Sequence, residues 1–215
     1  MKNHSHLKTI LLALFVTFLW STSFVIIKIG LSEIPPLTYA GLRYSIAFIC
    51  LLPLAFTKAK RVEIKNLNRS DWIKLFIYGL LFIAFTQGAM FTGLLFLPAV
   101  TVSLWLNFTP LVVAVLAIFL IKEYPTIRQW GGVLLFIAGI VIYFFPIVLS
   151  ENQEIGLIAM TIGVLANSGS SVLGRSINRE AKINPVLVTI VSMGVGAIVL
   201  LISGTLIQGL PSISL

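Results

Sequence analysis

The sequence holds few charges and almost none of the residues that form disulfides or metal sites. Asp, Glu, Lys and Arg make up only 10% of its 215 residues, and there are one cysteine and two histidines. The single cysteine, Cys50, excludes an intrachain disulfide, and His4 and His6 lie in the N-terminal tail without other ligand residues. We therefore expect no metal and no other cofactor. A soluble domain carries charges on about a quarter of its residues, so this shortage excludes an ordinary soluble fold.

Catalytic and nucleotide-binding motifs are also missing. The sequence contains no glycine-rich phosphate loop, no His-Glu-x-x-His and no Gly-x-Ser-x-Gly, which leaves ATP-driven chemistry and a membrane hydrolase without support. No Asp or Glu lies within an apolar run, so a carboxylate proton relay inside a membrane has no candidate. We therefore do not expect the protein to be an enzyme.

Long apolar runs dominate what the sequence does contain. Hydrophobic residues make up 58% of the chain, and the mean hydropathy is +1.05. A helix needs about 20 apolar residues to cross the roughly 30 Å hydrocarbon core, and lipid offers the backbone no hydrogen-bond partners, so continuous runs of this length favour helices. We predict an all-α polytopic membrane protein whose seven spans cover residues 7–29, 36–57, 72–96, 99–121, 129–149, 155–174 and 185–208.

The basic residues are concentrated on one side of the predicted membrane. Thirteen of the fifteen Lys and Arg residues lie in or beside the N-terminal tail and alternate loops, whereas the opposite loops hold only Glu33, Glu151 and Glu154. Cytoplasmic loops are enriched in Lys and Arg, so we expect a cytoplasmic N-terminus and a location in the plasma or inner membrane. The formal charge of +8 is then a topology signal, and the partner is the lipid bilayer, not nucleic acid.

Two stretches of the chain resemble each other at an offset of 147 residues. Residues 20–28 (Trp-Ser-Thr-Ser-Phe-Val-Ile-Ile-Lys) match residues 167–175 (Asn-Ser-Gly-Ser-Ser-Val-Leu-Gly-Arg) at two serines, the valine and the terminal cation. The offset spans five helices, an odd number, so the second copy begins on the other side of the membrane, as in the inverted repeats of secondary transporters. We assign residues 7–149 to a first five-helix repeat and residues 155–208 to a partial second repeat, with seven helices of an expected ten. We therefore expect the chain to be a fragment.

The first repeat resembles the EamA branch of the drug/metabolite transporter superfamily. The stretches that carry this resemblance follow one another along residues 10–145. They are Leu19–Phe24 with Lys28, Pro35-Pro36, Leu42-Arg43-Tyr44 with Ala47, Thr109-Pro110-Leu111 with Ala114 and Ala117, Lys122-Glu123, and Gln129–Gly132 with Gly139-Ile140. The resemblance implies ten helices in two inverted five-helix halves, with both termini in the cytoplasm.

Polar residues inside the predicted spans are the candidates for a substrate site. Arg43 lies roughly 10 Å below the outer surface, where it could attract a substrate carboxylate or phosphate. The alternative is that it hydrogen-bonds backbone carbonyls or extends to the interface. Asn107 lies mid-span three residues before Pro110, which is expected to kink the helix so that Asn107 and Ser103 form a cavity wall. The alternative for Asn107 is a hydrogen bond between helices.

Three further residues complete the predicted substrate site. Gln87 is an amide in the middle of the third span. Trp20 lies deeper than the interface where tryptophan usually occurs, and Asn167 is its counterpart in the second repeat. Each of the three could instead serve helix packing. Lys28, near a helix end, is expected to anchor that helix by extending to the interface.

Together these features predict a secondary transporter, an exporter of small polar metabolites that works by alternating access around a midplane cavity. Small-molecule substrates and the bilayer are then its partners, and a homodimer is compatible with the sequence. Two other interpretations remain open. One is a non-transporting subunit or scaffold completed by another chain, and the other, with the least support, is a membrane enzyme.

Overall fold

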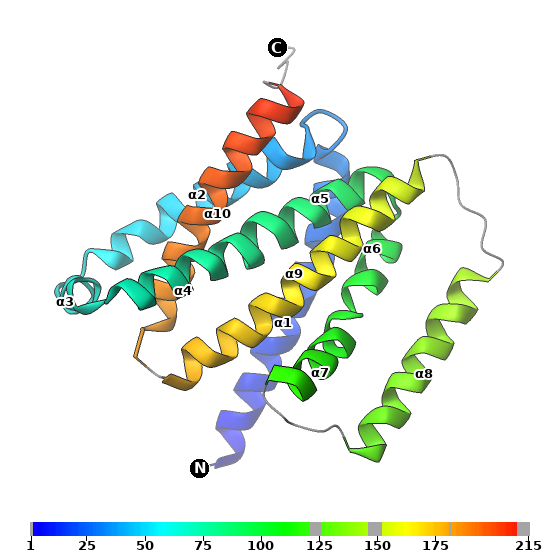
Figure 1. Cartoon of the computed structure of the whole chain (residues 1–215), viewed down its shortest axis with the longest axis horizontal. Helices are drawn as coiled ribbons and strands as arrows, with labels where there is room; N and C mark the ends of the chain where they lie inside the picture. The colour runs from blue at the N-terminus through cyan, green and yellow to red at the C-terminus, as the bar shows by residue number, and fades with distance from the viewer. Residues whose placement is uncertain (1, 121–125, 146–151, 181, 210–215) are drawn as a thin grey trace.

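The computed structural model describes residues 2–120, 126–145, 152–180 and 182–209, and every regular element in these ranges is helical. In chain order the elements are α1 (Lys2–Gly30), α2 (Pro36–Ala55), α3 (Lys58–Asn66), α4 (Arg69–Gly79), the π-helix η1 (Leu80–Phe85), α5 (Thr86–Phe96), α6 (Ala99–Leu106), α7 (Thr109–Leu120), α8 (Ile127–Phe144), α9 (Gln153–Glu180) and α10 (Pro185–Gln208). Figure 1 shows their arrangement.

Seven stretches of these ranges are long and apolar enough to cross a membrane. They are Leu7–Gly30, Pro36–Ala55, Arg69–Phe96, Ala99–Leu116, Ile127–Phe144, Gln153–Glu180 and Pro185–Gln208. The prediction of an all-α polytopic membrane protein with seven spans is therefore confirmed. The predicted ends of the fourth and fifth spans, at 121 and 149, lie outside the described residues.

The sixth span continues further than the sequence analysis predicted. α9 ends at Glu180, whereas its apolar run stops at Arg175 and the predicted end was residue 174. A helix satisfies its backbone hydrogen bonds internally and so needs no lipid to continue. The 28 residues of α9 span about 42 Å, which is longer than the hydrocarbon core. Arg175 and Arg179, expected in a loop, are therefore helical.

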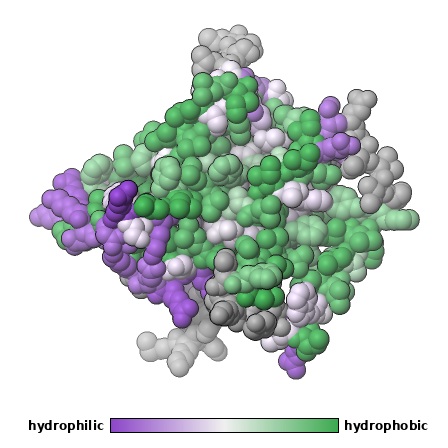
Figure 2. All heavy atoms as spheres, in the orientation of Figure 1, coloured by the Kyte–Doolittle hydropathy of each residue, from purple (hydrophilic) through white to green (hydrophobic). Residues whose placement is uncertain are grey.

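A short helix occupies the loop between the second and third spans, which the sequence analysis treated only as a basic linker. In α3, Ile64 packs with Leu67 against a buried cluster that includes Leu75 and Ile183. The helix also carries four basic residues, Lys58, Lys60, Arg61 and Lys65. Figure 2 shows hydrophilic residues gathered at the end of the molecule that carries α3, while apolar residues cover most of the remaining visible surface.

Among the described helices, α2 and α10 form the most extensive pair. Both helices begin with proline, Pro36 and Pro185, which suits a first turn that needs no N–H donor. Small residues let membrane helices approach closely, and Gly204 shows this best: an added Cβ there would lie 2.7 Å from the backbone nitrogen of Thr38.

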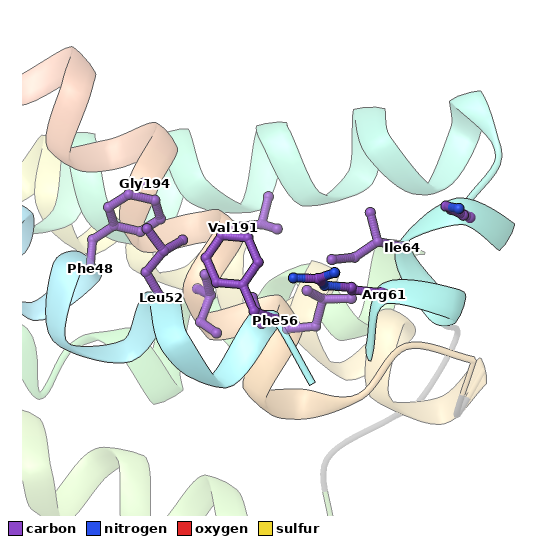
Figure 3. Close-up of a pocket in the computed structure, with 11 residues that line it drawn as sticks. Phe48, Leu52, Phe56, Arg61, Ile64, Val191 and Gly194 are labelled. Atoms are coloured by element: carbon purple, nitrogen blue, oxygen red, sulfur yellow. The ribbon is translucent and has the colours of Figure 1, made fainter. Parts of the chain in front are cut away.

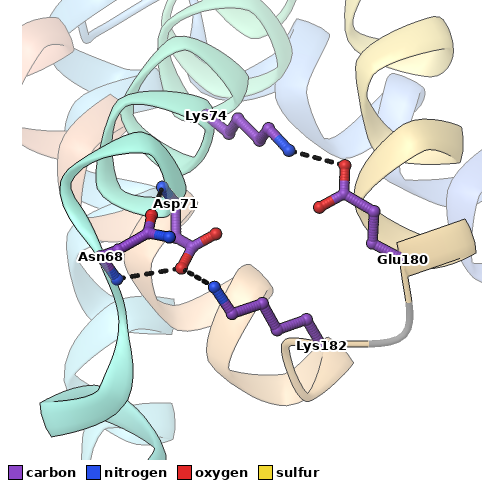
Figure 4. A network of polar contacts seen from close by, with 5 residues as sticks. All are labelled: Asn68, Asp71, Lys74, Glu180 and Lys182. Carbon is purple, nitrogen blue, oxygen red and sulfur yellow. Dashed lines mark hydrogen bonds and ion pairs between the residues drawn. The ribbon is translucent and has the colours of Figure 1, made fainter.

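Charged side chains tie the start of α4 to the connection between α9 and α10 (Figure 4). Asn68 and Asp71 form a reciprocal capping box at the first turn of α4. The Asp71 carboxylate, almost fully buried, also accepts from the Lys182 ammonium at 2.5 Å, and Lys74 pairs with Glu180 at 2.6 Å. The loops on either side of these contacts therefore meet at one end of the bundle, as the alternating charge pattern predicted.

The first and fifth spans lie at the edge of the bundle. From residue 7 to 21 the side chains of α1 are exposed, and α1 meets the core only near its end, through Phe24 and the buried Ile27. α8 has no buried residue and stands beside the other helices in Figure 1. Its contacts are aromatic: Phe136 meets Phe108 with ring centroids 5.3 Å apart, and Phe144 meets Trp105 at 6.0 Å.

Candidate functional site

The fourth span is broken near its middle. α6 ends at Leu106 and α7 begins at Thr109, which places Pro110 in the first turn of a new helix, where its missing N–H removes no helical hydrogen bond. The expected kink is thus a complete interruption at Asn107 and Phe108. The exposed Asn107 amide donates to the Ser103 carbonyl at 3.0 Å and caps the helix from which it comes.

α9 supplies the hydrogen bonds that hold this interruption in place. The Asn167 amide donates to the Thr109 hydroxyl at 3.1 Å, and the fully buried Ser168 hydroxyl lies 3.4 Å from the Thr109 carbonyl oxygen. Two residues before the break, the Trp105 indole N–H donates to the Thr161 hydroxyl at 3.3 Å. Two predicted site residues, Asn107 and Asn167, therefore belong to the same junction between broken helix and α9.

The third span contains a second irregularity. Leu80–Phe85 forms a π-helical segment between α4 and α5, and the Thr86 hydroxyl donates to the carbonyl of Leu81, five residues earlier, at 2.7 Å. This segment packs on both α9 and α10. Short π-helical segments occur often at functional sites. Gln87, a predicted site residue, follows directly and is half-buried, and its amide has no hydrogen-bond partner among the described residues.

Arg43 lies near two aromatic rings, one in its own helix and one in α5. Its guanidinium carbon lies 6.0 Å from the ring centre of Phe91 and 5.9 Å from that of Tyr44. Tyr39 holds the Phe91 ring from another side, edge-on at 5.3 Å. Gln87 and Phe91 are four residues apart on α5 and share one face. Arg43 and Gln87 thus flank the same face, and among the described residues the guanidinium has neither a carboxylate nor a carbonyl partner.

Lys28, expected to anchor the first span by extending to the interface, caps the end of a neighbouring helix. Its ammonium donates to the carbonyl oxygens of Leu94 at 2.5 Å and Leu97 at 2.8 Å, at the C-terminal end of α5. Cations at that end of a helix are stabilised by the partial negative charge of the unpaired carbonyls. The contact fixes the C-terminal end of α1 to the third span.

Trp20 is the one predicted site residue that the structure leaves apart from the others. Its side chain is 68% exposed, on the part of α1 whose side chains are exposed throughout. The structure thus groups four of the five predicted residues into two places. Asn107 and Asn167 lie at the break of the fourth span, and Arg43 and Gln87 lie on the Phe91 face of α5.

A polar hollow of about 660 Å³ between the third span and α9 was missed by the sequence analysis. It is lined by Tyr78, Phe82, Ser170, Ser171, Gly174, Arg175, Asn178 and Arg179. The rings of Tyr78 and Phe82 stack at 5.4 Å. The signal was present, because Ser171, Arg175 and Asn178 recur at helical spacing. It was overlooked because the end of the apolar run at 174 was taken as the end of the helix.

Seven apolar helices with two irregular spans and polar groups between them define a polytopic helical membrane protein with an interhelical polar site. The model of the EamA-like transporter family matches residues 7–145. This chain belongs to that family, and the resemblance stated from the motifs is confirmed.

Individual relatives are also transporters by name. The chain is 27% identical over 209 residues to the uncharacterized transporter YvbV of Bacillus subtilis (strain 168), an alignment that covers 95% of this chain and 65% of the relative. It is 23% identical over 199 residues to the uncharacterized transporter YoaV of the same organism, with 92% and 66% covered. A protein of Escherichia coli (strain K12) named "Probable amino-acid metabolite efflux pump" is 35% identical over 133 residues, with 61% and 41% covered. The chain therefore spans just under two thirds of the length of YvbV and YoaV, the two relatives here that align with more than nine tenths of it.

Proposed function

We propose that the protein is a secondary transporter that exports small polar metabolites by alternating access. The observation that carries the proposal is the pair of irregular spans, the break at residues 107–108 and the π-helix Leu80–Phe85, both packed against α9. Interrupted helices mark the midplane sites of secondary transporters, because they expose backbone and side-chain polar groups to a substrate. Membership of a transporter family and a relative named as a metabolite efflux pump support it.

The substrate groups would be recognised from two sides. The Thr109–Asn167 junction offers a hydroxyl and an amide that can exchange partners, and the Phe91 face offers the guanidinium of Arg43 and the unpaired amide of Gln87. Such donors suit a small solute with carboxylate or carbonyl oxygens. Trp20 stays a prediction of the same site, on an α1 face that another conformation or another helix would have to cover.

The orientation and the extent of the transporter belong to the same proposal. We infer a cytoplasmic N-terminus in the plasma or inner membrane from the charge pattern. Contacts between the α9–α10 connection and the basic loop before α4 support this, because they bring two basic loops to one side. Since the chain spans 65% of YvbV, the activity is proposed for a protein in which both inverted repeats are complete.

A scaffold or subunit role is the second candidate. It is favoured by the exposed apolar side chains of α1 and by α8, which has no buried residue. A partner chain, or a second copy in a homodimer, would cover these helices in the membrane. Cross-linking in native membranes distinguishes this candidate, because a monomer that transports on its own contradicts it.

The transport proposal is tested by flux measurements in proteoliposomes. The protein with both repeats complete is reconstituted, and a panel of labelled amino acids and related carboxylates is screened for counterflow. For the solute that moves, Asn167→Ala and Gln87→Ala are expected to lower the rate at least tenfold. Thr205→Ala is the matched control, because that exposed hydroxyl bonds only carbonyls of its own helix. Equal rates in all variants would refute the site, and no flux of any solute would refute the function.

A further inference from the structure

A second cavity lies outside the transport site, where α2, α3 and α10 meet. It has a volume of about 580 Å³ (Figure 3), within the range of roughly 300–1,000 Å³ typical of small-molecule sites. Its walls are apolar along most of their length, formed by Phe48, Leu52, Ala55 and Phe56 on one side and Leu187, Ile190, Val191 and Gly194 on the other. Arg61 and Lys65 of α3 also line it. Figure 3 shows Phe48 and Arg61 at opposite ends of the lining.

The two cations at this cavity have no anionic partner among the described residues. The neighbouring carboxylates Asp71 and Glu180 pair with other lysines. Arg61 and Lys65 are four residues apart and therefore share one face of α3. The Arg61 guanidinium carbon lies 5.4 Å from the ring centre of Phe56, a contact that holds the charge at the cavity without using its N–H donors.

The position of the cations is fixed by the packing of α3. Ile64, between them on the same helix, joins the buried cluster around Leu75. Glu63 accepts a hydrogen bond from the backbone N–H of Asn184 at the start of α10. These two contacts hold α3 against the third and seventh spans. Arg61 and Lys65 are thus presented to the cavity by a docked helix.

The chemistry of the cavity is that of an amphiphile with a negative head. A soluble anion would pair with the two cations but would not contact the apolar walls. A neutral hydrocarbon would contact the walls but leave the cations unpaired. α3 follows the end of the second span, so the cations lie at the membrane boundary. In the orientation proposed above this is the cytoplasmic leaflet, where anionic lipids attract basic groups and bind in basic pockets between membrane helices.

We propose that this cavity binds one anionic phospholipid. The headgroup phosphate lies between Arg61 and Lys65, and one acyl chain follows the slot along Leu52 and Val191 toward Phe48. The slot is narrow at that end, because the position of an added Cβ on Gly194 is 2.9 Å from the Phe48 ring. The site does not depend on transport and would be present in a scaffold protein as well.

Native mass spectrometry of the purified protein, titrated with phosphatidylglycerol or phosphatidylcholine in detergent, tests the proposal. We expect one phosphatidylglycerol to be retained in preference to phosphatidylcholine. Arg61→Gln and Lys65→Gln should each weaken its retention about fivefold, and the double variant roughly 25-fold. The control is Lys58→Gln with Lys60→Gln, which removes the same charge from the same helix but not from the cavity, and it should bind as the unaltered protein does.

The acyl slot is tested separately. Leu52→Trp fills the slot without changing any charge, and it should reduce phosphatidylglycerol retention while the thermal midpoint stays within a few degrees of that of the unaltered protein. Inorganic phosphate in excess should not displace the lipid. If the Lys58/Lys60 control loses phosphatidylglycerol equally, the lipid is attracted by the basic surface in general and the proposed site is refuted. Displacement by phosphate would make it a simple anion site, and a second protein copy lost on Leu52→Trp would make the cavity an interface between copies.

Discussion

Replacing Lys28 by methionine tests how the first span is held to the bundle. The substitution keeps the length of the side chain but removes the ammonium that donates to the carbonyl oxygens of Leu94 and Leu97 at 2.5 and 2.8 Å. Those carbonyls then lose their partner at the end of α5. Because α1 meets the core only near its end, through Phe24 and Ile27, this contact adds to a small set of packing interactions.

The expected cost follows from the number and setting of these bonds. Hydrogen bonds between membrane helices contribute about 0.6 kcal/mol on average and up to about 1.7 kcal/mol. A cation at a partly buried helix C-terminus contributes up to about 2 kcal/mol. The ammonium is only partly buried, so the sum is discounted to about 1–2 kcal/mol. This corresponds to a change of about 5- to 30-fold in the unfolding equilibrium.

The assay is reversible unfolding in mixed micelles, followed by tryptophan fluorescence. Lys28→Arg should retain most of the stability, because guanidinium donors reach the same carbonyls. Lys8→Met is the matched control: Lys8 is exposed in the same helix. If Lys28→Met and Lys8→Met unfold alike, the capping contact does not stabilise the protein and the reasoning is refuted.

Two further predictions concern the packing of α2 on α10 and the ion pair between Asp71 and Lys182. Gly204→Val should lower the unfolding free energy by about 1–3 kcal/mol, because its Cβ would lie 2.7 Å from the Thr38 nitrogen. Gly131→Val, with no atom within 4 Å, should not lower it, because valine has a slightly higher helix propensity than glycine. Thermal melts in detergent compare the two variants. Asp71→Asn and Lys182→Gln should each speed proteolysis of the α9–α10 connection, and the double variant no more than the stronger single one, because both break one ion pair. Additive effects would contradict this.

Individual residues show how far sequence reasoning reached into the site. Pro110 predicted an irregular fourth span because proline carries no backbone donor, and the irregularity lies within three residues of it. The partner of that irregularity was not predictable, since Asn167 is 58 residues from Thr109 and only folding brings them to 3.1 Å. Nothing local marks the π-helix Leu80–Phe85 either. It packs where Gly196 lets α10 approach Ile83, a contact between distant segments.

Lys28 and Arg175 show where sequence reasoning stopped short of the structure. For Lys28 the sequence predicted an anchor at the end of the first span. The carbonyls that its ammonium contacts were not predictable, because they lie 66 and 69 residues further along the chain. Arg175 was assigned to a loop because hydropathy reports where lipid ends and not where a helix ends. Its helical spacing with Ser171 and Asn178 was readable but unused.

The sequence by itself determined the class of this protein: seven apolar stretches, the helical state of each and their membership of the EamA-like family. These follow from properties local in the chain, because a bilayer forces every spanning segment to satisfy its own backbone hydrogen bonds. Only the tertiary structure decided which polar groups meet. The Thr109–Asn167 junction, the Arg43–Phe91 contact and the cation-lined cavity under α3 each join residues from different helices, and helix packing depends on the shapes of both surfaces at once.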